Sequence, residues 1–162
     1  MSVGRLRRGE LIAGASGAAL LVFLFALHWY GVSGTFGRTL ALGLHARTSW
    51  TGWQGLTYVR WLLLVTALVA LGLAYFQAVE RAPAIPVTLA VMTTVLGGLS
   101  ALALIARVID TPGNHLGRRA GVYLALAAAI GIAYGGFASL REESGADPAE
   151  LEIETVGLPE PT

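Results

Sequence analysis

Two long apolar runs, separated by a short polar turn, constrain this chain more than any other feature. Residues 61–79 and 85–106 contain no charged side chain, and Glu80 and Arg81 lie between them. A helix of about 20 residues is roughly 30 Å long, which is the thickness of the hydrocarbon core of a bilayer. A soluble helix does not need to be apolar on every face. The pair therefore predicts a transmembrane hairpin.

Two further runs without Asp, Glu, Lys or Arg lie at residues 11–30 and 120–140. The first ends in His28-Trp29-Tyr30, and such aromatic residues are typical of the headgroup level of a membrane. It is also longer than the apolar part of a secretory signal peptide, which favours a retained helix. The sequence predicts an all-α, four-helix transmembrane bundle with helices at about 11–30, 61–79, 85–106 and 120–140.

Composition is consistent with a single membrane domain. Of the 162 residues, 55% are hydrophobic and 13% charged, whereas soluble domains carry about a quarter charged residues. Residues 1–141 are expected to form the four-span domain with an outer loop at 31–60. Residues 142–162 form an acidic tail that has too little apolar surface to fold alone, so we expect it to be disordered. The chain has no cysteine, which excludes disulfides and thiolate chemistry.

Aromatic side chains gather in the outer loop and beside it. Thr51 and Gln54 fit a capping box that would start the second helix before the membrane. An aromatic belt that anchors the chain at the interface accounts for this composition, and an outward platform for a lipid, a sugar or a partner is the alternative. The interaction candidates on this outer face are His28, Trp29, Tyr30, Trp50, Trp53, Arg60 and Trp61.

Small residues are expected to hold the spans together, because close packing replaces the hydrophobic effect between helices in lipid. Several glycines and alanines recur four residues apart, which is the spacing of one helix face. The same spacing also fits a dimer face, so the oligomeric state stays open. The candidates for helix packing are Gly14, Gly17, Gly97, Gly98, Gly131 and Gly135.

No predicted span carries an ionisable residue in its middle, which is the usual mark of an ion path or proton relay. Glu10 lies at the edge of the first span. No phosphate-binding loop, HExxH motif or nucleophile motif is present in the sequence. We therefore assign no catalytic residue, metal or cofactor, and we expect no nucleic-acid partner. An outer-face zinc site remains an alternative, with the candidate ligands His28, His45, His115 and Asp110.

Four spans place both termini on one side of the membrane. The cluster of Arg5, Arg7 and Arg8 favours the cytoplasm for that side, although the count is five arginines inside against six outside. All 11 basic residues are arginine, and with so much Ala and Gly this composition is typical of GC-rich bacterial genomes. We expect a multi-pass protein of the bacterial plasma membrane with cytoplasmic N- and C-termini.

The layout resembles small uncharacterised four-helix membrane proteins of GC-rich bacteria. The points of resemblance are the basic start at 5–10, the His28-Trp29-Tyr30 end of the first helix, the Trp-containing outer loop and Gly121-Val122-Tyr123-Leu124. That resemblance implies no activity. A fainter likeness to claudin-type tetraspans rests on the four helices, the larger first outer loop and Trp50 with Gly55-Leu56. Claudins fix that loop with a disulfide, which this chain cannot form.

The leading functional hypothesis is a non-enzymatic accessory or scaffold subunit. Its partners would be the lipid bilayer and either another membrane protein or further copies of the chain. The alternative is a small homo-oligomeric transporter or lipid-handling protein. A polar cavity in the bundle, or a groove open to lipid near Trp50, Trp53 and Arg60, would favour that alternative.

Overall fold

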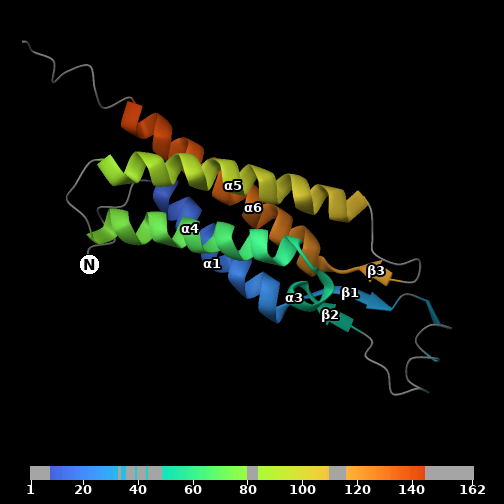
Figure 1. The fold of residues 1–162 in the computed structure, drawn as a ribbon. Coiled ribbons are helices and arrows are strands. Elements are labelled where there is room, and N and C mark those ends of the chain that lie inside the picture. Colours follow the sequence, from blue (N-terminus) through green and yellow to red (C-terminus); the bar gives the residue numbers. More distant parts are fainter. Residues whose placement is uncertain are drawn as a thin grey trace, which may run out of the picture.

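Four long helices form a bundle in the computed structural model (Figure 1). The structure describes residues 8–32, 34–35, 39, 43, 49–79, 84–109 and 116–144. Each of the four helices contains a stretch that is long and apolar enough to cross a membrane. The predicted four-helix bundle is therefore confirmed. The helices are α1 (Arg8–Ala26), α4 (Val59–Val79), α5 (Ala84–Ile109) and α6 (Ala120–Ser144).

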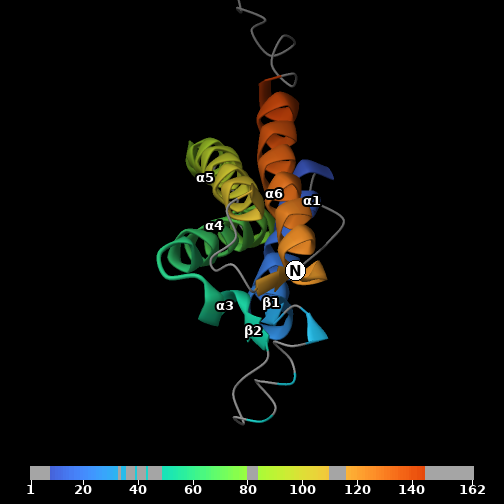
Figure 2. The same ribbon diagram turned by 90° about the vertical axis from the view of Figure 1, so that its right-hand side faces the viewer.

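Helices that follow one another in the sequence also lie side by side in the bundle. α1 packs against α4 and α6, and α5 packs against the same two helices, so α6 closes the bundle onto α1 (Figure 2). The chain runs up and down, so that each long helix is antiparallel to the next (Figure 1). The beginning of α1 and the end of α6 therefore lie at the same end, here called the terminal end (Figure 1).

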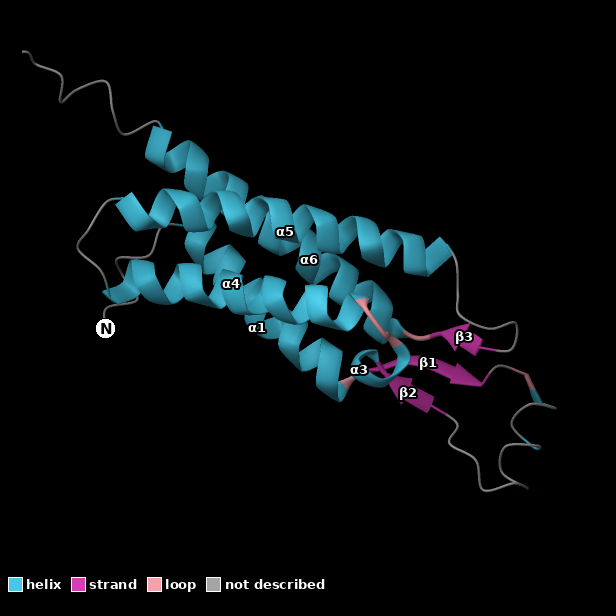
Figure 3. Cartoon of the chain, viewed as in Figure 1, coloured by secondary structure: helices cyan, strands magenta, loops and turns pink. Residues whose placement is uncertain are grey.

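A small sheet covers the opposite end, here called the sheet end (Figure 3). Its strands are β1 (His28–Val32), β2 (Ser49–Thr51) and β3 (Leu116–Arg118), in the antiparallel order β2-β1-β3. The sequence did not predict this sheet. The first helix ends at Ala26 rather than at Tyr30, because the chain turns into β1 there.

The predicted outer loop at 31–60 contains more regular structure than expected. β2 leads into a one-turn helix, α3 (Gly52–Gly55), and α4 begins only at Val59. Thr51 is indeed an N-cap residue, but it precedes α3 and its side chain makes no capping hydrogen bond. The capping box predicted for the second helix is therefore wrong.

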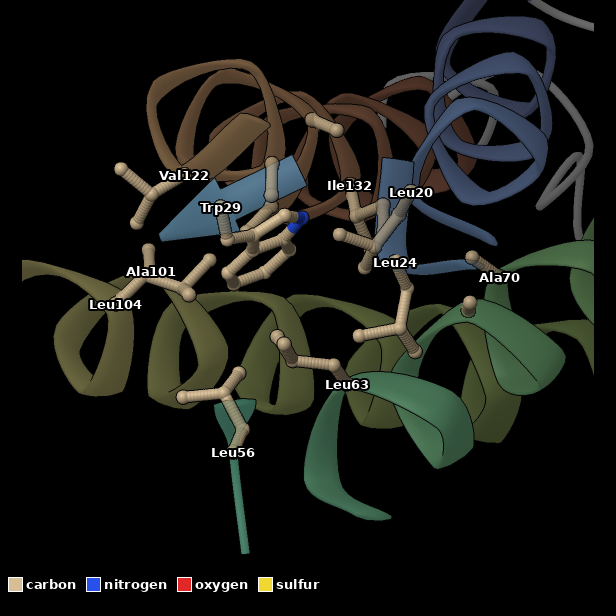
Figure 4. Packing of buried hydrophobic residues seen from close by; sticks show 14 of the residues in the cluster. Leu20, Leu24, Trp29, Leu56, Leu63, Ala70, Ala101, Leu104, Val122 and Ile132 are labelled. Carbon is tan, nitrogen blue, oxygen red and sulfur yellow. The ribbon is translucent and has the colours of Figure 1, made fainter. Parts of the chain in front are cut away.

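The larger part of the core lies in the half of the bundle next to the sheet. Leucines of α1, α4 and α5 meet Val122 and Ile132 of α6 there, with the indole of Trp29 among them (Figure 4). A smaller cluster of Ala13, Leu73 and Ala90 lies nearer the terminal end. Most other large side chains of α4 and α5 point outward, among them Leu68 and Leu102. This pattern fits helices surrounded by lipid.

Five of the six glycines predicted for helix packing lie where two helices meet. A Cβ atom at Gly14 would lie 2.6 Å from the Ala74 Cβ, and one at Gly17 would lie 3.2 Å from the Ala67 carbonyl oxygen. Between helices α5 and α6, a Cβ at Gly97 would lie 2.6 Å from the Ala133 nitrogen. A larger residue at Gly14 or Gly97 would force the helices to shift, whereas at Gly17 the neighbours would have to give by a few tenths of an ångström.

Of the remaining three glycines, two lie at a helix contact and one does not. Gly131 faces Ser16, and a Cβ at Gly135 would lie 2.5 Å from the Ala13 nitrogen, so both belong to the contact between α1 and α6. A Cβ at Gly98 would meet nothing within 4 Å among the described residues. Gly98 is thus not a packing residue of this bundle.

The end of α6 reaches beyond the predicted fourth span. Glu142 and the two residues after it belong to the helix, so the predicted tail does not begin at residue 142. The disorder predicted for residues 145–162 concerns residues outside the described part of the chain.

Candidate functional site

Trp29, in the first half of β1, is held by glycines of two other elements. Its side chain is fully buried. A Cβ at Gly52 would lie 2.5 Å from the indole Cε2, and one at Gly121 would lie 2.6 Å from Cδ1. The indole therefore fills a slot between α3 and α6 that only glycine leaves open.

Tyr30 is buried on the other face of β1, because neighbouring residues of a strand point in opposite directions. Its ring lies against Gly55, where a Cβ would come within 2.8 Å of the tyrosine Cδ2. Its hydroxyl is buried and has no hydrogen-bond partner among the described residues. Burial raises the pKa of Tyr30 above 10.0, and the charges of Arg107 and Arg118 offset part of that rise.

Both residues were predicted as outer-face interaction candidates, and the structure corrects that expectation. Trp29 is 0% exposed and Tyr30 is 1% exposed, so neither presents a surface to a partner. Of their neighbours, His28 is exposed, and Trp50 is partly buried opposite Tyr30 in β2.

Arg60, Trp53, Trp61 and Phe25 form a cluster at the sheet end, here called the arginine–tryptophan cluster. The guanidinium carbon of Arg60 lies 5.1 Å from the ring centroid of Trp53 and 5.6 Å from that of Trp61. The two indoles stand edge to face at 5.3 Å, and Phe25 lies 5.0 Å from Trp53. These distances are in the range of cation–π and aromatic pairing.

The hydrogen-bonding capacity of Arg60 is largely unused among the described residues. Nη1 donates one long hydrogen bond of 3.4 Å to the Trp53 carbonyl. Nε is buried and has no partner there. A guanidinium has five N–H donors. The aromatic rings therefore hold the Arg60 guanidinium in place while most of its donors have no acceptor among the described residues.

The surroundings of this cluster are apolar and open, and the neighbouring sequence is rich in arginine. Trp61 is 53% exposed and Phe25 49%. The sequence segments that flank the sheet, 27–60 and 107–119, contain six arginines and a single acidic residue, Asp110. The arrangement suits an anionic group at the boundary between lipid and water.

The metal-site alternative stays a prediction. His45, His115 and Asp110 lie outside the described residues, and His28 alone of the set is placed. Within the described ranges, no group of three His, Asp or Glu side chains could hold a metal ion.

The polar side chains inside the bundle are mostly satisfied by their own helices, as threonine and serine commonly are. Thr66 donates to the Leu62 carbonyl at 2.8 Å, and its oxygen lies 2.7 Å from that of Ser100. Ser139 is the exception, since its buried hydroxyl has no partner among the described residues. Glu10 is buried in the first turn of α1, at the edge of the span and not in its middle.

The terminal end carries a second feature that the sequence analysis missed. An open depression of about 280 Å³ lies along α6, where the guanidinium carbon of Arg141 is 5.9 Å from the Phe137 ring centroid. The spacing of its residues along one helix face was the available signal. The lining residues are Tyr134, Phe137, Ala138, Arg141 and Glu142.

No protein-family model, no curated protein and no solved structure matches this chain.

Proposed function

We propose that the protein is a non-enzymatic accessory or scaffold subunit of a membrane assembly in the bacterial plasma membrane. It would act through contacts with other membrane components and not through a reaction or a transport path. The observation that carries this proposal is the close packing of the four helices by small residues.

Transport of a polar solute requires a wet path, and the described interior offers no support for one. Gly135 lies against the backbone of α1 at Ala13, and Gly97 lies against the backbone of α6 at Ala133. Helices this close leave no room for a channel between them. Charged residues within the described helices are confined to their ends, so a mid-membrane proton relay has no residue to use.

The proposal includes an orientation, with the terminal end in the cytoplasm and the sheet end outside. The tight cluster of Arg5, Arg7 and Arg8 ahead of the first span supports this choice. Membership among the small four-helix membrane proteins of GC-rich bacteria is part of the same proposal.

A lipid-handling role is the second candidate, because one observation favours it. The arginine–tryptophan cluster combines an incompletely bonded cation with exposed aromatic rings. That combination suits contact with lipid headgroups, although it does not by itself move a lipid.

Native mass spectrometry of the protein, extracted gently from its own membrane at its natural expression level, tests the leading proposal. A subunit is expected to carry a second, different polypeptide in fixed stoichiometry. The control is the same measurement after overproduction, in which excess free protein should appear beside the complex. A monomer or homo-oligomer alone at natural levels would contradict the accessory role.

A further inference from the structure

We propose that Arg60 binds the phosphate group of an anionic phospholipid at the sheet end of the bundle. This inference is independent of the proposed partner protein, since it concerns the purified chain and its lipid. Every residue that carries it belongs to the described part of the chain.

The first argument is the state of the arginine itself. Trp53 and Trp61 hold the guanidinium at 5.1 and 5.6 Å from their ring centroids, so its position is set before any ligand arrives. Its one hydrogen bond among the described residues, to the Trp53 carbonyl, is 3.4 Å long. The buried Nε lacks a partner among the described residues. A phosphate presents oxygens that match the fork of a guanidinium and would accept hydrogen bonds from its two terminal nitrogens, which are not buried as Nε is.

The second argument is the position of Arg60 in the first turn of α4. The N-terminus of a helix carries a partial positive charge that favours anions and disfavours cations. The first turn of α4 contains no acidic residue that could offset both charges. An external anion at this point would interact favourably with the guanidinium and with the helix dipole together.

The third argument concerns the rest of the ligand. Phe25 and Trp61 are about half exposed beside the guanidinium, and Tyr58, two residues before Arg60 in the sequence, is 82% exposed. Aromatic rings of this kind prefer the interfacial region of a bilayer. A lipid can place its phosphate on Arg60 and its acyl chains along these rings, whereas a free phosphate ion would use only the arginine.

The matched control for Arg60 is Arg119, at the same end of the bundle. Arg119 is exposed, and its guanidinium lies over Gly31 of β1. Changing either arginine to glutamine removes one positive charge from the sheet end. Only the change at Arg60 removes a guanidinium held between two tryptophans.

The experiment titrates delipidated protein in detergent with dioleoyl phosphatidylglycerol or dioleoyl phosphatidylcholine and counts bound lipid by native mass spectrometry. The wild type should bind phosphatidylglycerol in preference. Arg60→Gln should weaken this binding by about tenfold, since hydrogen bonds to charged groups contribute at least that much. Arg119→Gln should stay within about twofold of the wild type, as expected for a screened surface charge. Millimolar inorganic phosphate should not displace the lipid.

Three results would overturn the proposal. Equal losses in Arg60→Gln and Arg119→Gln would show that the net charge alone attracts the lipid. Full competition by inorganic phosphate would identify an anion site that does not recognise lipid. Unchanged binding in Arg60→Gln would remove Arg60 from the site. Arg60→Lys guards against misfolding, because it keeps the charge but loses the fork, and it should show an intermediate loss.

Discussion

The indole nitrogen of Trp29 donates a hydrogen bond of 2.7 Å to the backbone carbonyl of Phe23. Phe23 lies in the last turn of α1, where carbonyl groups have no partner within the helix. Because the same indole is enclosed by Gly52 and Gly121, one side chain caps α1 and connects it to α3 and α6. This contact fixes the sheet to the end of the bundle.

Replacing Trp29 with phenylalanine should lower the free energy of unfolding by about 1–3 kcal/mol, because the Phe23 carbonyl is left without its donor and the smaller ring leaves a void. Unfolding by heat or denaturant in detergent micelles measures the change. Trp61→Phe serves as the control, since Trp61 is 53% exposed, and it should change stability by no more than about 0.5 kcal/mol. An equal loss of unfolding free energy in the two variants would show that the hydrogen bond from Trp29 to the Phe23 carbonyl does not stabilise the fold.

Two adjacent glycines of α5 should respond to alanine in opposite directions. Gly97→Ala places a methyl group against the Ala133 backbone, and such overpacking costs about 1–3 kcal/mol. Gly98→Ala meets open space among the described residues, so it should be neutral or stabilise the helix by up to about 1 kcal/mol. Melting temperatures of the two variants in one detergent provide the comparison. A larger drop in melting temperature for Gly98→Ala than for Gly97→Ala would be inconsistent with the packing of α5 on α6.

Tyr30→Phe should raise the free energy of unfolding at neutral pH by about 1 kcal/mol, because it removes a buried hydroxyl that lacks a partner among the described residues. Equilibrium unfolding of the variant and the wild type at pH 7 measures this. A loss of stability instead would mean that the hydroxyl makes a bond that the described residues do not provide.

The same tyrosine makes stability depend on pH at the alkaline end. Burial raises the pKa of Tyr30 above 10.0 in the folded protein, so the unfolded chain releases this proton first. Ionisation of Tyr30 therefore leaves stability unchanged below about pH 10.0, and the free energy of unfolding falls as the pH rises from there through the folded pKa. Melting temperatures measured across that range should fall more steeply for the wild type than for Tyr30→Phe. Parallel curves would exclude Tyr30 as the cause.

The four helices could be predicted because each one can be recognised from its own stretch of sequence. A run of 20 residues without a charged side chain has few soluble alternatives, so residues 61–79 and 85–106 needed no tertiary information. The glycines of the helix contacts were mostly found for the same reason. Gly98 shows the limit of that approach, since its neighbour Gly97 has the same local sequence and only the bundle distinguishes them.

The sheet and the true roles of its aromatic residues could not be predicted. β2 and β3 have three residues each, which is too short for an alternating pattern, and they pair with β1 across long stretches of sequence. Trp29 and Trp61 both look like interfacial tryptophans. Trp29 is buried because Gly52 and Gly121, which are distant in sequence, leave space for its ring. Arg60 and Trp61 are consecutive residues, so their proximity needed no tertiary information.

The central claim is that the four helices span a membrane, with the sheet end on one side and the terminal end on the other. Cysteine labelling tests this claim most directly. The chain has no natural cysteine, so Gln54→Cys at the sheet end, Glu142→Cys at the terminal end and Val95→Cys on the exposed face of α5 each provide one thiol. In intact cells, a membrane-impermeant maleimide should label Gln54→Cys alone. Glu142→Cys should react only after the cells are opened, and Val95→Cys only after detergent or denaturant removes the lipid. Labelling of Gln54→Cys and Glu142→Cys from the same side, or rapid labelling of Val95→Cys in the membrane, would contradict the account.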